Sequence, residues 1–188
     1  MDHILKKFTD ILCGTLDNQA QVYQERRDGH QIHPYARHVT AICDHKILNR
    51  PADHPGLYIL EESYYVKPGS EMMELKPLLF YMRSDGFSKA LLNSVQIPEY
   101  ISKEEARNDN QYLKMDFKDL KLRNFGTAEY ELQEDGSFKV DHQADMGGGI
   151  TFRLIETLSP SGLNVMELVH KDGIKITPYD TPIEYRKV

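Results

Sequence analysis

The hydrophobic residues of the first twelve positions recur at helical spacing. Ile4, Phe8, Ile11 and Leu12 fall on one side of a helical projection. Asp2 stands where a side chain can cap the first turn, and a glycine follows where a helix can end. This pattern predicts a helix over 4–12 with one apolar face.

A second, polar helical stretch is predicted directly afterwards. Asp17 can cap it, the stretch runs toward Arg26, and Asp28-Gly29 forms a turn signal. The amides of Asn18 and Gln21 can bond buried backbone groups, so we expect them to fix this helix to the rest of the fold. The helical segment is therefore predicted to span residues 2–27.

From His33 onward the pattern changes to short runs rich in β-branched and aromatic residues, separated by turn signals. Asp-Gly and Ser-Gly pairs between neighbouring runs indicate hairpins. Ser102 and Glu105 have the capping-box spacing after Pro98, which predicts one or two helical turns over 102–108. The predicted strands are 33–43, 57–66, 76–82, 91–97, 115–120, 125–132, 137–142, 150–158, 163–170 and 174–186.

This succession of short strands and turns predicts a mainly β protein with an antiparallel sheet, closed as a barrel or stacked as a sandwich. We favour a barrel at 33–188, because the strand from Leu57 to Val66 carries polar groups on both faces. The sequence shows no repeat, low-complexity tract or linker, so we expect a single domain over 1–188.

Composition and charge narrow the classes of partner. The 188 residues are 40% hydrophobic and 28% charged, which is typical of a folded globular domain. A net charge of -6 gives no attraction for nucleic acid or an anionic membrane surface. No run of about 18 apolar residues occurs, and the N-terminus lacks an export-signal pattern. We expect a cytoplasmic protein that binds neither nucleic acid nor membrane, and a homodimer is possible.

No metal or cofactor site is expected. His33 and His38 are five residues apart on a predicted strand and would point to opposite faces. Gly147 to Gly149 precede a strand pattern and not a phosphate-binding helix. Cys13 and Cys43 stand where small buried hydrophobes are usual.

Three predicted strands carry one carboxylate each on an otherwise apolar face: Glu61, Glu156 and Glu167. A carboxylate in a dry interior is costly unless it has a partner, so such groups indicate a partner or a ligand. Arg37, which shares a face with Tyr35, is the expected partner of Glu61.

We therefore predict a barrel lumen with an apolar wall and a few polar anchors. The expected ligand-binding residues are Arg37, Tyr35, Tyr65, Glu156 and Glu167. An interior salt bridge, or carboxylates at the rim of the sheet, is the alternative interpretation.

Three local motifs resemble one known family. The stretch GTLDNQAQ over 14–21 is similar to the N-terminal helix signature of the CpcT/CpeT-type phycobiliprotein chromophore lyases. The strand YILEESY over 58–64 resembles that family's Glu-Gln-Ala-Tyr strand, and TPIEYR over 181–186 resembles its closing strand. The family's Pro-Tyr-Arg-x-Arg segment is replaced here by KPLLF over 76–80, and no cysteine follows Cys43.

The resemblance implies a calycin, or lipocalin-like, barrel that holds a linear tetrapyrrole (bilin) as substrate or ligand. It also implies a phycobiliprotein subunit as partner, whose cysteine thiolate would add to the bilin. In that scheme Glu61 is the general acid/base and Tyr64 a proton donor. A noncatalytic carrier or sensor with the same pocket, and an interaction module with a filled barrel, remain alternatives.

Overall fold

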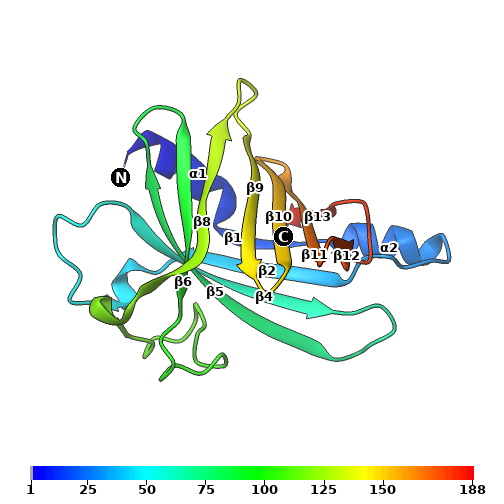
Figure 1. The fold of residues 1–188 in the computed structure, drawn as a ribbon, viewed down its shortest axis with the longest axis horizontal. Helices are drawn as coiled ribbons and strands as arrows, with labels where there is room; N and C mark the ends of the chain where they lie inside the picture. The colour runs from blue at the N-terminus through cyan, green and yellow to red at the C-terminus, as the bar shows by residue number, and fades with distance from the viewer. Residues whose placement is uncertain (1) are drawn as a thin grey trace.

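The computed structural model describes residues 2–188 and shows a closed antiparallel barrel (Figure 1). Each strand pairs with its neighbours around the sheet, and the pairing of β10 with β11 closes it. In spatial order the barrel strands are β1 (Gly14–Asp17), β2 (Tyr35–Ile42), β4 (Leu57–Val66), β5 (Met73–Ser84), β6 (Lys89–Gln96), β8 (Lys121–Leu132), β9 (Phe138–Gly147), β10 (Ile150–Ser159), β11 (Gly162–Lys171) and β13 (Ile183–Lys187). The prediction of a mainly β, antiparallel barrel is confirmed.

Helix α1 (His3–Leu12) packs its apolar face into the barrel core. The Asp2 carboxylate accepts the backbone N–H of Leu5 at 3.0 Å, which caps the first turn as predicted. Phe8 is 1% exposed and packs edge-to-face against Tyr130 and Phe138, with ring centroids 5.0 Å apart in both pairs. The helix therefore contributes its apolar side chains to the barrel core.

Helix α2 (Gln19–Arg27) is polar and lies outside the barrel against β2 and β13. Asn18 accepts the backbone N–H of Ala36 at 2.7 Å and donates to the carbonyl of Pro34 at 2.9 Å. Gln21 donates to the carbonyl of Pro182 at 2.9 Å and accepts the N–H of Glu184 at 3.0 Å. The two amides join the helix to an early and to the last strand of the barrel, as the sequence predicts.

The register between β2 and β4 decides which side chains face the lumen. Thr40 lies opposite Glu61 and His38 opposite Ser63, and these pairs point inward. Arg37 lies opposite Tyr64 on the outer face. The inward face of β4 therefore carries the odd-numbered residues, and that of β2 the even-numbered ones.

A second, smaller core covers the outer face of β4 and β5. Residues 98–120 fold over these strands and include β7 (Met115–Asp116), which pairs in parallel with β3 (Ile47–Leu48), and the 3₁₀ turn η2 (Phe117–Asp119). A further 3₁₀ turn, η1 (Asp44–Lys46), follows Cys43, whose burial in this core raises the pKa of its thiol to about 12. Because β4 is covered on both sides, its first four residues, Leu57 to Leu60, are apolar on both faces, and its polar residues begin at Glu61.

Several boundaries differ from prediction. Strand β1 interrupts the predicted helical segment 2–27, and its four residues pair with both β2 and β13. The predicted strand 174–186 is split into β12 (Ile174–Lys175) and β13, since Pro178 and Pro182 cannot donate to a ladder. Residues 115–120 contribute only two strand residues. Residues 102–108 form a single turn with the capping box intact, and not a helix.

No helix among residues 2–188 is both long and apolar enough to cross a membrane.

Candidate functional site

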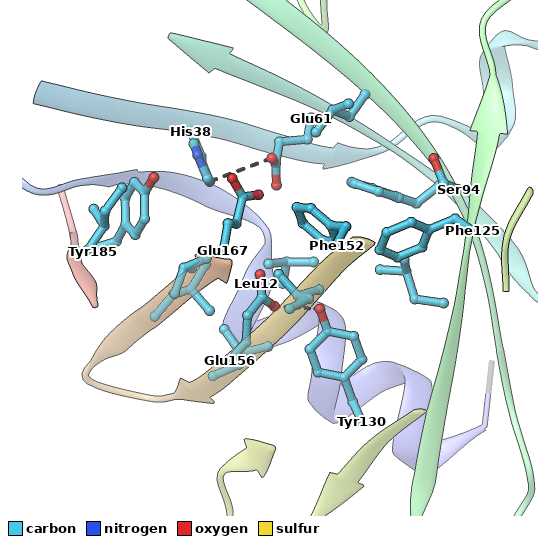
Figure 2. A pocket seen from close by; sticks show the side chains of 18 of the residues that line it. Leu12, His38, Glu61, Ser94, Phe125, Tyr130, Phe152, Glu156, Glu167 and Tyr185 are labelled. Carbon is cyan, nitrogen blue, oxygen red and sulfur yellow. Dashed lines mark hydrogen bonds and ion pairs between the residues drawn. The ribbon is translucent and has the colours of Figure 1, made fainter. Parts of the chain in front are cut away.

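The barrel holds a cavity of about 230 Å³, and Phe8 and Leu12 of α1 form part of its wall. Most of its wall is apolar or aromatic, with Phe125, Phe152 and the tyrosines prominent (Figure 2). The polar groups of the wall are few: His38, Glu61, Ser94, Glu156, Glu167 and tyrosine hydroxyls. An apolar hollow with a small number of polar anchors is typical of small-molecule sites.

Glu61 of β4 is held in place by its strand neighbours. Ser63 donates to its Oε1 at 2.8 Å, and Thr40 donates to its Oε2 at 3.4 Å. The Nδ1 of His38 lies 3.6 Å from Oε1, an ion-pair contact when the imidazole is protonated. Glu61 is 8% exposed and lines the cavity, so its carboxylate is oriented from two adjacent strands.

His38 of β2 contacts the site through both ring nitrogens. Its Nε2 lies 3.3 Å from the hydroxyl of Tyr65, and its ring centroid is 4.3 Å from that of Tyr185. The Nδ1 has no hydrogen-bond partner among the described residues, although the side chain is buried. A buried nitrogen without a hydrogen bond is uncommon, and this one belongs to a residue of the cavity wall.

Glu156 of β10 is paired with a tyrosine. Burial raises the pKa of Glu156 to about 8, the hydroxyl of Tyr130 donates to its Oε2 and lowers the pKa, and Glu61 and Glu167 raise it. Burial beside this carboxyl also raises the pKa of Tyr130 well above its usual value. Glu156 is therefore a group that holds a proton near neutral pH.

Glu167 of β11 is the least satisfied of the three carboxyls. Among residues 2–188, no hydrogen bond or ion pair reaches its carboxylate from another residue. Burial in the wall raises the pKa of Glu167, with a further increase from Glu61 and a decrease from Lys76. The residue is nevertheless exposed, at the point where its side chain borders the hollow.

The structure brings Tyr65, Glu61, Glu156 and Glu167 together around the cavity, as strand parity predicts. Burial also raises the pKa of Tyr65, and the Glu167 and Glu61 charges raise it further. The ligand-binding and catalytic roles assigned to these residues stay predictions.

Arg37 and Tyr35 lie outside the lumen, so their predicted place in the cavity wall is wrong. Tyr64, the predicted proton donor, also lies outside the cavity wall. Arg37 is exposed on the outer face, with its guanidinium carbon 6.0 Å from the ring centroid of Tyr64. Tyr35 shares that outer face. Tyr64 donates its hydroxyl to Glu62 at 2.5 Å, beside Arg107, outside the barrel. The side chain that contacts the Glu61 carboxylate is therefore not Arg37, as expected, but His38, the next residue along the strand.

Sequence reasoning missed His38 and Tyr130 as site residues. His38 shares strand parity with Ala36 and Thr40, a small and a short residue, so β2 gives no apolar alternation to mark its inner face. Tyr130 lies on a strand with Ala128 inward, where the pattern is equally weak. No group of three or more His, Cys, Asp or Glu residues suited to a metal ion occurs within residues 2–188.

Comparisons with protein-family models and with curated proteins found no match to this chain. The resemblance to the chromophore lyases therefore rests on the three motifs alone.

Proposed function

We propose that this protein binds a small, partly apolar molecule in the lumen of its barrel. The observation that carries the proposal is the hollow itself, since native interiors are normally packed without space for more than a water molecule. A cavity of about 230 Å³ lined by rings and aliphatic side chains is space that a ligand would fill.

The polar groups in the wall support binding over a filled structural core. An interior that served packing alone would lose little stability with apolar residues in place of Glu61 and Glu156, because hydrogen bonds offset only part of the free energy that burying a carboxyl group costs. Glu167 adds a third carboxyl at the edge of the same hollow. Glu61 is held by β4, and Glu156 and Glu167 are held by the paired strands β10 and β11. Their arrangement fits polar recognition of a molecule at the centre.

The linear tetrapyrrole implied by the resemblance is one candidate ligand under this proposal. Pyrrole N–H groups are donors that lumen carboxylates can accept. The cavity volume lies below the range of about 300–1,000 Å³ usual for drug-sized ligands, so a bilin would extend beyond the hollow through an end of the barrel. In a lyase reaction Glu61 is the acid/base that the lumen offers, whereas Tyr64 is outside it.

A fluorescence titration with the neutral apolar probe N-phenyl-1-naphthylamine tests the proposal. We expect saturable enhancement with the parent protein and a loss of about tenfold or more in affinity with Ser94→Phe, which places a ring in the hollow. Thr157→Phe on the outer face of β10 is the matched control and should bind as the parent does. No saturable binding, or equal binding by Ser94→Phe, contradicts a ligand-binding lumen.

A further inference from the structure

The charges around the cavity are unbalanced. Three carboxyls line it, and no Lys or Arg among the described residues is part of its wall. His38 is the one side chain of the described wall that can become cationic, and it contacts Glu61 alone among the three. With Glu61 and Glu167 ionised, the lumen carries an excess of negative charge even when His38 is protonated and Glu156 holds its proton.

Lys76 is the nearest candidate for a balancing charge, and it stands at the rim. It lies opposite Ser63 on β5, so it shares the inward face, but it is exposed and outside the wall. Its Nζ is 5.4 Å from the ring centroid of Tyr65 and makes no ion pair with Glu167. Its charge lowers the pKa of Glu167 without overcoming the effect of burial.

Two polar groups of the wall have hydrogen-bonding capacity to spare. The Glu167 carboxylate, exposed where it borders the hollow, accepts no hydrogen bond from another residue within 2–188. The buried Nδ1 of His38 makes no hydrogen bond, and Oε1 of Glu61 lies 3.6 Å from it. Figure 2 shows Glu61 and Glu167 on the same side of the cavity, beside His38, while Glu156 turns toward Tyr130. A ligand group placed between Glu61 and Glu167 would meet two carboxylates at once.

We infer that the ligand is a small aromatic or aliphatic amine whose cationic nitrogen sits between Glu61 and Glu167. This inference rests on the proposed function and adds the ligand's chemical class. A protonated amine has donors and no acceptor, which matches carboxylates that have free acceptor capacity. The rings of Phe125, Phe152 and Tyr65 line the cavity and would contact the apolar body of the ligand.

The carboxylates of the lumen disfavour ligands that carry a negative charge. A carboxylate-bearing ligand of the same size would place a further negative charge beside Glu61 and Glu167, with only His38 to meet it. A neutral alcohol would gain the apolar contacts and one hydrogen bond, without the charge interaction.

Three probes of matched size separate these cases: 2-phenylethylamine, 2-phenylethanol and phenylacetate, each titrated calorimetrically and by displacement of N-phenyl-1-naphthylamine at about pH 7.5, where the amine is protonated. We expect the amine to bind about tenfold tighter than the alcohol, and phenylacetate to bind weakest. Alcohol binding equal to or tighter than amine binding, while the neutral probe still binds, overturns the amine inference and leaves the proposed function standing. Failure of the neutral probe itself contradicts the proposed function.

Charge-removing variants locate the amine. Glu167→Gln should lower the affinity for 2-phenylethylamine about fivefold or more and leave the alcohol within about twofold, because the variant keeps the shape and loses the charge. Glu131→Gln, exposed on the outer face of β8, removes the same charge and should change nothing. Lys76→Gln should strengthen amine binding by removing a rim cation. Unchanged amine affinity in Glu167→Gln contradicts the assigned position, and the ligand series on the parent protein needs no variant to fold.

Discussion

At the scale of single residues, the site is defined by strand parity. The alternation along β4, β10 and β11 predicts that Glu61, Glu156 and Glu167 face inward, because each sits among apolar neighbours two residues away. Arg37 could not be placed in this way, since a one-residue change of phase moves every side chain to the other face and β2 has little alternation to fix the phase. His38 consequently takes the place expected for Arg37.

The pH dependence of stability follows from Glu156. Its pKa is raised from 4.5 to about 8 by burial, with Tyr130, Glu61 and Glu167 as its charged or titratable neighbours. Between these pH values the folded chain holds a proton that the unfolded chain has released, so raising the pH favours unfolding. The cost of ionising Glu156 is absent below pH 4.5 and complete above about 8.

We therefore expect the melting temperature to fall between about pH 5 and 8 in the parent protein, and to fall less in Glu156→Gln. A change of about 1 kcal/mol in the free energy of unfolding shifts the melting temperature by about 2–4 °C for a chain of this size. Calorimetric scans at several pH values measure it, with Glu131→Gln as the control for loss of a carboxyl. Parallel curves for the parent and Glu156→Gln would show that Glu156 ionises as freely as an exposed carboxyl.

At the scale of elements, the barrel depends on segments whose sequence signal is weak. The periodicity of α1 and the boundaries of β4 are readable, because their apolar residues are packed against one defined surface or between two. Strand β1 cannot be recognised from the sequence, because pairing with β2 and β13 fixes its four residues and their own pattern does not. The long-range pairing that closes the barrel is therefore the part that the sequence leaves open.

The amide of Asn18 tests how α2 is attached. Asn18→Ala removes the acceptor for the N–H of Ala36, a fully buried residue, and the donor to Pro34. We expect the free energy of unfolding to fall by about 1–3 kcal/mol. Urea unfolding measures it, and Gln19→Ala on the exposed side of the same helix is the control. Equal stability of the two variants would mean that the Asn18 bonds are replaced by water at no cost.

Replacing Phe8 tests how much the packing of α1 against the barrel contributes to stability. Phe8→Ala removes a ring that packs on Tyr130 and Phe138, so we expect a loss of about 3–5 kcal/mol in the free energy of unfolding. Because Phe8 also lines the cavity, the variant should enlarge it and accept N-phenyl-1-naphthylamine more readily, if it stays folded. Lys7→Ala, exposed on the other face of α1, should lie within about 0.5 kcal/mol of the parent. A Phe8→Ala loss as small as that of Lys7→Ala would contradict the packing described.

At the scale of the whole molecule, two cores share the same strands and differ in what they enclose. The inner core joins α1 to the barrel and surrounds a hollow with three carboxyls. The outer core packs residues 98–120 against β4 and β5 around Leu60, Leu79 and Met115. A small molecule that binds in the lumen must therefore contact the inner core and leave the outer core unchanged.

The most direct measurement of this claim is a methyl-resolved NMR titration of the parent protein with N-phenyl-1-naphthylamine. The lumen methyls to follow are those of Leu12, Leu92, Leu158 and Val165, and the outer-core methyls are those of Leu60, Val95 and Leu113. We predict saturable shifts in the first set and none in the second, because only the first set borders the cavity. Shifts confined to the outer core, or no saturable shift in the lumen methyls, would contradict a ligand-binding barrel.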